Sequence, residues 1–292
     1  MCVSQSPVAD RAPGGEAKMH PGVGPRKDPF PAAGSCAKEQ RMQISETCLL
    51  TFSLWLAVSA LVAAPAPGVQ VEQRLELADG RSIPYLLYLP ETYADQPGRS
   101  WPLMLFLHGR GESHGPLSLV KKWGPPRLLD QGVHLPYVVV SPQCPGNESW
   151  AQPRQQALLL ALLDHLLAQH RIDAHRVVLT GLSMGGYGSW RLAADHPERF
   201  AAVIPICGGG SPNDAARLKD LPIWVFHGTE DQAVPFRRSV EMVDAIRAAG
   251  GARIRFTSLE HVGHNSWESA YATPDLYQWL EAQLAERPQP TD

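Results

Sequence analysis

A serine lies between two glycines in the segment Gly181-Leu-Ser183-Met-Gly185, directly after the apolar run 176–180. The pattern G-x-S-x-G between a strand and a helix is typical of a strained turn that exposes a serine hydroxyl as a nucleophile. Glycine is needed on both sides because a Cβ there would strike the neighbouring strand or helix. Residues 184–195 have the apolar spacing of a helix, so the expected context is present. The segment therefore predicts nucleophilic chemistry at Ser183.

A serine hydroxyl is a weak nucleophile, so it needs a general base and an acidic residue to orient that base. After this type of turn the acid comes first along the chain and the histidine second. Two carboxylates, Glu230 and Asp231, follow the apolar run 223–226. We assign Asp231 as the acid because it precedes a Val-Pro turn, and we keep Glu230 as the alternative.

Two histidines, His261 and His264, follow the last predicted strand and compete for the role of base. We favour His264 because Gly263 gives its loop the freedom to reach back, and we expect His261 to be a structural partner. The i, i+3 spacing of the two rings also suggests a metal pair. No third histidine, cysteine or clustered aspartate supplements them nearby, so we expect neither a metal nor a cofactor.

The oxyanion that forms during attack on a carbonyl needs backbone N–H donors that are already in place. One donor is expected from Met184, the residue after the nucleophile. The second is expected from the loop 108–112, which follows the apolar run 103–107. We assign it to the N–H of Arg110, with Gly111 as the alternative.

Three further side chains can contribute to a substrate pocket, although each has an ordinary structural explanation. Trp150 and Trp267 can line an acyl or aryl pocket, but a large aromatic side chain is just as often part of the core. Glu112 lies beside the oxyanion loop and can hold that loop or contact a polar substrate. A solvated surface position is the slightly favoured interpretation of Glu112.

The elements that must position these residues alternate between strands and helices. Short apolar runs predict strands at residues 69–77, 82–89, 102–107, 137–141, 176–180, 201–206, 222–226 and 252–258. Helical spacing is found at residues 117–131 (broken at a Pro-Pro pair), 155–170, 184–195, 237–249 and 274–286. The first two strands form an antiparallel pair with a turn at Asp79-Gly80, and the remaining alternation predicts an α/β fold. Its central sheet is mostly parallel with helices on both faces, and the short connection 207–221 has no room for a cap domain.

Composition excludes several classes of partner. The 292 residues are 44% hydrophobic and 19% charged, with a formal net charge of -3. Such a chain has no basic footprint for nucleic acid or for an anionic membrane surface. We therefore expect no nucleic-acid partner.

The first part of the chain has a different composition from the rest. We expect residues 1–47 to be a disordered or wrongly assigned extension, with Met42 as the true start. The uncharged stretch 48–64 and the small residues that follow resemble a signal peptide ending near residue 66, and an uncleaved membrane anchor is the alternative. This predicts a secreted or periplasmic catalytic domain at residues 67–292, with no stable membrane partner unless the stretch 48–64 is retained. That domain contains two cysteines, Cys144 and Cys207, expected as buried thiols with a disulfide as the alternative.

Taken together, the motifs resemble the alpha/beta-hydrolases, and in particular the lidless branch that groups predicted peptidases, phospholipase/carboxylesterases and dienelactone-hydrolase-like proteins. The resemblance covers residues 80–285. It is carried by Leu-His108-Gly-Arg-Gly-Glu112, Ser141-Pro-Gln-Cys-Pro145, Thr180-Gly-Leu-Ser-Met-Gly-Gly-Tyr187, Pro205-Ile-Cys-Gly-Gly-Gly210, Pro222-Ile-Trp-Val-Phe-His-Gly228 with Asp231, and Gly263-His-Asn-Ser-Trp267.

The resemblance implies an alpha/beta-hydrolase fold without a cap domain, a triad of Ser183, Asp231 and His264, and ester hydrolysis through an acyl-enzyme. The expected substrates are short-chain, aryl or polysaccharide-linked acyl esters, and a serine peptidase for small peptides is the alternative. True dienelactone hydrolases have a cysteine as nucleophile, which argues against a lactone substrate here. Arg110 stands where the family usually has a small residue, which either narrows the cleft or favours an anionic group. A non-catalytic binding module is the remaining alternative from another class.

Overall fold

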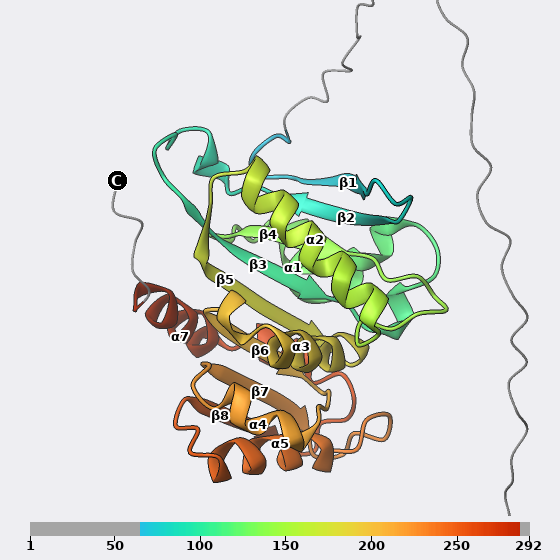
Figure 1. Cartoon of the computed structure of the whole chain (residues 1–292), viewed down its shortest axis with the longest axis vertical. Helices are drawn as coiled ribbons and strands as arrows, with labels where there is room; N and C mark the ends of the chain where they lie inside the picture. The colour runs from blue at the N-terminus through green and yellow to red at the C-terminus, as the bar shows by residue number, and fades with distance from the viewer. Residues whose placement is uncertain (1–64, 287–292) are drawn as a thin grey trace, which may run out of the picture. The chain divides into compact units, whose positions relative to one another are not determined.

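The computed structural model describes residues 65–286, which form an eight-stranded sheet between two layers of helices (Figure 1). The predicted extension 1–47 and the apolar stretch 48–64 lie outside the described residues. The strands follow the spatial order β1-β2-β4-β3-β5-β6-β7-β8. Their bounds are β1 (Gln70–Glu76), β2 (Ser82–Tyr88), β3 (Trp101–Leu107), β4 (Val138–Pro142), β5 (Ile172–Leu182), β6 (Ala202–Ile206), β7 (Ile223–Gly228) and β8 (Ile254–Leu259).

The pairing of the strands confirms the predicted mixture of directions. β1 and β2 form an antiparallel hairpin, and β2 pairs antiparallel with β4. All remaining pairs are parallel. At the hairpin turn Gly80 has a φ of +80°, which favours glycine, and Asp79 accepts the backbone N–H of Arg81 at 3.0 Å.

The helices cover both faces of the sheet, as the alternation of elements predicts. Their bounds are α1 (Gly124–Asp130), α2 (Pro153–Gln169), α3 (Met184–Asp195), α4 (Ala215–Leu218), α5 (Arg237–Ala248), α6 (Trp267–Tyr271) and α7 (Pro274–Ala285). One apolar core joins α2, α3, α4 and α5 to one face, and a second core joins α1, α6 and α7 to the other. Figure 1 shows α2 and α3 in front of the sheet.

Strand β3 illustrates how the sequence produces these two cores. All seven of its residues are buried, as expected of a parallel strand in the middle of a sheet. Leu103 and Leu105 face the first core, while Met104 and Phe106 face the second, because successive side chains of a strand point to opposite faces. Each such fully buried side chain contributes roughly 1.5–3 kcal/mol of transfer free energy.

Two elements differ from the sequence-based expectation for identifiable reasons. β5 begins at Ile172, earlier than the predicted start at Arg176. The early part of the strand escaped prediction because Asp173 and Arg176 interrupt its apolar run; the buried Asp173 carboxylate binds Arg176 at 2.7 Å. The stretch 117–131 is divided as predicted, into the 3-10 helix Leu117–Lys122 and α1, but the break falls at Trp123, just before the proline pair. Pro125 and Pro126 stand in the first turn of α1, where proline lacks only an N–H that would be unpaired anyway.

The connection from β6 to β7 is short, and in the described residues it contains only a single turn of 3-10 helix and the four-residue α4. The sheet edge above Ser183 therefore carries no cap domain within residues 65–286. In the same part of the chain, no helix combines the length and apolarity that crossing a bilayer requires.

Candidate active site

Ser183 stands alone in the junction between β5 and α3, at the carboxyl edge of the sheet. Its backbone has a φ of 53° and a ψ of −115°, a conformation that residues with a Cβ rarely adopt. Backbone strain of this kind amounts to about 1–3 kcal/mol and persists only where the surroundings impose it. Here the N–H of Ser183 donates to the Ile206 carbonyl at 2.9 Å, which ties the turn to β6.

The flanking glycines are required for the steric reason that the sequence suggests. A Cβ on Gly185 would lie 1.9 Å from the carbonyl oxygen of Leu107 in β3. A Cβ on Gly181 would lie 2.5 Å from the carbonyl oxygen of Gly185. The first turn of α3 thus packs against the backbone of β3 so closely that only glycine fits.

His264 connects Ser183 to Asp231. Its Nε2 lies 2.9 Å from Ser183 Oγ, and its Nδ1 lies 2.7 Å from Asp231 Oδ2. An ionised carboxylate only accepts hydrogen bonds, so Nδ1 carries the proton and Nε2 presents its lone pair to the serine hydroxyl. Asp231 comes from the loop after β7 and His264 from the loop after β8, so two neighbouring strands deliver the two side chains.

Both oxygens of the Asp231 carboxylate accept hydrogen bonds. Its Oδ1 accepts the backbone N–H groups of Ala233 and Val234, each at 2.8 Å. Burial by itself would raise the pKa of the Asp231 carboxyl, but the bond from His264 and these two amides outweigh it and leave the pKa below its usual value. Asp231 is therefore ionised at neutral pH, as the assigned proton on His264 requires.

The two alternative residues pair with each other instead of with Ser183. His261 Nδ1 lies 2.9 Å from Glu230 Oε1, and both side chains are exposed. The structure brings Ser183, Asp231 and His264 together and leaves Glu230 and His261 as a hydrogen-bonded pair on the surface.

A second histidine, which the sequence analysis did not single out, contacts the same carboxylate. His227 lies at the end of β7, is fully buried, and places its Nε2 3.1 Å from Asp231 Oδ2. In the sequence His227 belongs to the segment 222–228 that helps to carry the family resemblance, but no role is assigned to it there.

The oxyanion loop is held by a buried histidine. His108 Nε2 accepts the N–H of Cys144 at 3.0 Å, so the ring proton is on Nδ1, which donates to the Gly109 carbonyl at 2.6 Å. Burial lowers the pKa of His108 to about 4, so the ring is neutral at pH 7. Because the ring bridges the loop to the segment after β4, the backbone after Gly109 is fixed beside the serine turn.

The two assigned oxyanion donors come from the residue after Ser183 and from the residue after Gly109, and a Cβ on Gly109 would lie 3.7 Å from Ser183 Cβ. Met184 is the first residue of α3, where the unpaired N–H groups and the helix dipole favour negative charge. Arg110 begins the short 3-10 helix Arg110–Glu112 after β3. Its guanidinium donates to the carbonyls of Gly146 and Glu148, at 3.5 and 3.0 Å, and so is engaged with the neighbouring loop.

Glu112 is buried and does not occupy the solvated position that the sequence favoured. Only 3% of its surface is exposed, and a Cβ on Gly109 would lie 3.2 Å from Glu112 Oε2 and 3.7 Å from Ser183 Cβ. Burial raises the pKa of the Glu112 carboxyl, while the Lys122 ammonium, nearby amides and the Trp123 indole oppose the rise. The carboxyl group thus lies under the oxyanion loop, close to the nucleophile, which fits the loop-holding alternative.

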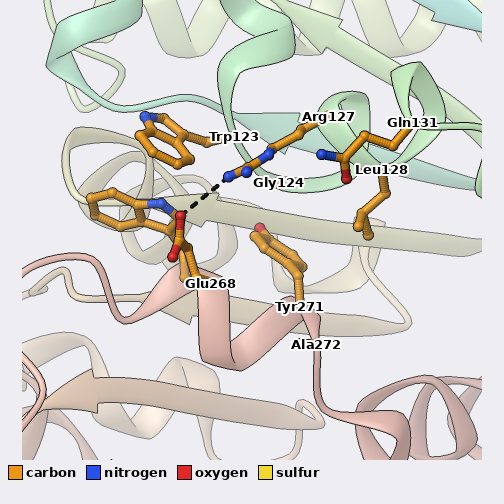
Figure 2. Close-up of a pocket in the computed structure, with 9 residues that line it drawn as sticks. Trp123, Gly124, Arg127, Leu128, Gln131, Glu268, Tyr271 and Ala272 are labelled. Atoms are coloured by element: carbon orange, nitrogen blue, oxygen red, sulfur yellow. Dashed lines mark hydrogen bonds and ion pairs between the residues drawn. The ribbon is translucent and has the colours of Figure 1, made fainter.

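Trp150 does not line a pocket, because it lies in the core, which was the alternative expectation. Trp267 does line a cavity. Trp150 is fully buried, donates its indole N–H to the His108 carbonyl at 3.0 Å, and supports the oxyanion loop from inside the core. Trp267 lies edge-on to His264, with ring centroids 5.3 Å apart, and faces Trp123 at 5.7 Å. It lines a cavity of about 250 Å³ between α1 and α6. Figure 2 shows this cavity with the Arg127–Glu268 ion pair beside the two indoles.

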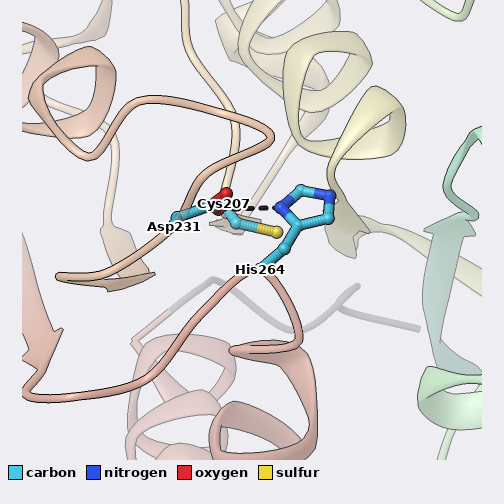
Figure 3. A group of neighbouring side chains, drawn as sticks. All are labelled: Cys207, Asp231 and His264. Carbon is cyan, nitrogen blue, oxygen red and sulfur yellow. Dashed lines mark hydrogen bonds and ion pairs between the residues drawn. The ribbon is translucent and has the colours of Figure 1, made fainter.

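Both cysteines among the described residues are buried and unpaired, so the disulfide alternative is wrong and the two-thiol expectation is confirmed. Cys207 lies beside the Asp231–His264 hydrogen bond (Figure 3). One ligand-type atom of each of these three side chains lies within 4.8 Å of the others, a spacing that suits a metal ion. Asp231 Oδ2 and His264 Nδ1 are already bonded to each other, however, and burial raises the pKa of the Cys207 thiol to about 12. A protonated thiol is a poor metal ligand, so we interpret the three side chains as parts of one hydrogen-bonded site.

Comparison with known proteins shows similarity to esterases. Residues 142–278 match the family described as Phospholipase/Carboxylesterase. A thermostable esterase of known structure is 35% identical and superposes with a TM-score of 0.64, covering 73% of this chain and 62% of its own. A ferulic acid esterase, 20% identical with a TM-score of 0.55 over 74% of this chain and 98% of its own, shares the fold.

Two of the similar proteins are named as a depolymerase and as an acetylxylan esterase. Poly(3-hydroxyalkanoate) depolymerase C of Paucimonas lemoignei is 29% identical over 185 residues, which make up 59% of this chain and 43% of the depolymerase. The bifunctional acetylxylan esterase/xylanase XynS20E of Neocallimastix patriciarum is 25% identical over 170 residues, 57% of this chain and 24% of that protein. The chain therefore spans less than half the length of these two relatives.

Proposed function

We propose that this chain, which has the alpha/beta-hydrolase fold, is a serine carboxylesterase. One observation carries the proposal: His264 lies 2.9 Å from Ser183 Oγ through Nε2 and 2.7 Å from Asp231 Oδ2 through Nδ1. This order of contacts gives the serine a base and gives the base an orienting anion, which is what nucleophilic attack on an ester requires.

Each residue then has a defined step. Ser183 Oγ attacks the ester carbonyl while His264 Nε2 takes its proton, and Asp231 stabilises the imidazolium that forms. The negative charge on the former carbonyl oxygen is held by the N–H groups of Met184 and Arg110. His264 returns the proton to the leaving alcohol, which leaves an acyl group on Ser183, and a water activated by the same histidine releases it.

The cavity between α1 and α6 supports a small acyl or aryl group as the part of the substrate that is recognised. Its volume of about 250 Å³ is less than that of pockets for drug-sized ligands, which begin at about 300 Å³. Trp123 and Trp267 form its aromatic wall, and Trp267 contacts the proposed base directly. Because the described residues carry no cap over Ser183, the alcohol side of the ester can be large, including a polysaccharide.

Secretion is part of the same proposal. The stretch 48–64 resembles a signal peptide, which supports export of the enzyme. We therefore place the mature enzyme outside the cell or in a periplasm. The N-terminal sequence of the protein recovered from a secreting host tests this point, and a chain that retains residues 48–64 would contradict it.

A substrate panel tests the reaction class. The wild-type protein and its Ser183→Ala variant are assayed with aryl acetates, longer acyl esters and aminoacyl anilides. The proposal expects turnover of short-chain and aryl esters that Ser183→Ala abolishes without loss of folding. Faster turnover of the anilides would support a peptidase instead, and ester hydrolysis by Ser183→Ala would refute the assignment of the nucleophile.

A further inference from the structure

We propose that His227 is a positioning residue for the triad: its Nε2–H bond to Asp231 weakens the carboxylate as a proton acceptor and ties it to the serine turn. The inference rests on the proposed function, because it concerns the acid that orients His264. It adds to the mechanism a second histidine that never contacts substrate.

The contacts of His227 define its tautomer. Its Nε2 lies 3.0 Å from the Val234 carbonyl oxygen and 3.1 Å from Asp231 Oδ2, and both of these atoms only accept hydrogen bonds. Nε2 must therefore carry a proton. Burial lowers the pKa of His227, so the ring is neutral and its Nδ1 is an acceptor. The Ser239 hydroxyl, 2.7 Å away, is the matching donor.

Asp231 Oδ2 consequently receives the ring N–H of His264, and it shares the single Nε2–H of His227 with the Val234 carbonyl oxygen. The bond from His264 is shorter, at 2.7 Å, than the bond from His227, at 3.1 Å. The N–H of His227 withdraws part of the negative charge that would otherwise stabilise a protonated His264. His227 thus limits how strongly Asp231 favours the imidazolium, and a base that is protonated too readily is unavailable at neutral pH.

The other side of the ring leads back to the nucleophile. Ser239 in α5 also lies 3.2 Å from the carbonyl oxygen of Gly208, in the loop after β6, so its single hydroxyl proton faces two acceptors, His227 Nδ1 and this oxygen. That loop touches the first turn of α3, since a Cβ on Gly208 would lie 2.8 Å from the Cα of Gly186. A continuous set of contacts therefore joins Asp231 through His227 and Ser239 to the helix that begins beside Ser183.

Few charged groups compete with these contacts. Asp231 and His264 are the ionisable groups that act on His227, and Phe236 covers one edge of its ring, with centroids 5.6 Å apart. Cys207, which interacts with Asp231, is held as a neutral thiol by burial. A change in the acid limb of the pH–rate profile on altering His227 can therefore be traced to the Asp231–His264 pair.

Two amide substitutions provide the test because they differ only in reach. In His227→Gln the amide nitrogen can occupy the position of the ring Nε2 and still donate to Asp231, whereas in His227→Asn it can reach only the Nδ1 position. We expect His227→Asn to lower kcat/KM roughly 10- to 100-fold and to move the acid limb about one pH unit higher. His227→Gln should restore most of both. Ser239→Ala, which removes only the partner of Nδ1, should give a smaller change in the same direction.

The readouts separate this inference from the proposed function. The titration of the His264 ring is followed by NMR in the wild type and in both variants, and it reports on the Asp231–His264 pair whether or not an ester is turned over. Wild-type protein without esterase activity would refute the proposed function. An unshifted titration in His227→Asn, or equal losses in the Asn and Gln variants with an unchanged acid limb, would overturn the inference and leave His227 a packing residue. His261→Ala, at the exposed histidine, is the control and should match the wild type.

Discussion

Replacing Asp231 by asparagine tests the geometry of the site, because it exchanges one carboxylate oxygen for an NH₂ group and removes the negative charge while the side chain keeps nearly the same size. Oδ1 accepts two backbone N–H groups at 2.8 Å, so the amide oxygen of the new side chain must face them. Its NH₂ group is then directed at His264 Nδ1 and His227 Nε2, both of which carry protons in the native site. Two donors cannot bond to each other, so His264 must move its proton to Nε2.

The consequence for turnover follows from that tautomer. With a proton on Nε2, His264 can no longer accept the Ser183 proton across the 2.9 Å contact. The same substitution in another Ser-His-Asp hydrolase lowers kcat about 10⁴-fold, equal to roughly 5 kcal/mol of transition-state stabilisation. We expect a loss of this size for Asp231→Asn, measured as kcat/KM for p-nitrophenyl acetate, while the thermal unfolding midpoint shows that the variant is folded.

Glu230→Gln is the matched control, because it makes the same chemical change one residue earlier. Glu230 pairs with the exposed His261, and exposed pairs contribute about 1 kcal/mol or less. Its kcat/KM should stay within about threefold of the wild type. Activity of Asp231→Asn within tenfold of the wild type, or equal losses in the two variants, would refute the assignment of the acid and the tautomer argument with it.

Further variants probe the base, the turn and the buried thiol. His264→Ala should lower kcat by about 10⁴-fold or more, while His261→Ala should not; equal small effects in an ester assay would contradict the choice of base. Gly185→Ala places a Cβ 1.9 Å from the Leu107 carbonyl oxygen and should cost roughly 2–4 kcal/mol of stability by denaturant unfolding, whereas an unchanged midpoint would mean that the turn can relax. Because burial raises the pKa of Cys207 to about 12, the thiol is neutral at pH 8 and should react with a disulfide reagent only after unfolding. Rapid reaction in the folded protein would show that it is accessible.

Much of the fold could be predicted because local signals and the final packing agree. The Asp79-Gly80 turn and the two-sided burial of β3 are both visible as short patterns, and the structure reproduces them. The start of β5 could not be predicted, since Asp173 resembles a loop residue until its ion pair with Arg176 is seen. The four-residue α4 was also missed, because a single helical turn has no periodicity to detect.

Side chains whose partners lie far along the chain could not be placed from sequence. Trp150 resembles a pocket residue, but its indole binds the carbonyl of a residue 42 positions earlier. Glu112 resembles a surface carboxylate, yet the loop folds it inward beside Ser183. No local sequence pattern assigns a role to His227. Its contacts with Asp231 and Ser239 form only when β7 packs against α5.

Covalent labelling of the purified protein with a fluorophosphonate probe is the most direct test of the central claim. The reagent reacts with a serine only where a base has activated it, and peptide mass mapping identifies the serine. The account predicts a single adduct on Ser183, fast in the wild type and lost in His264→Ala. A folded protein that takes up no probe, or that is modified at another serine, would contradict it.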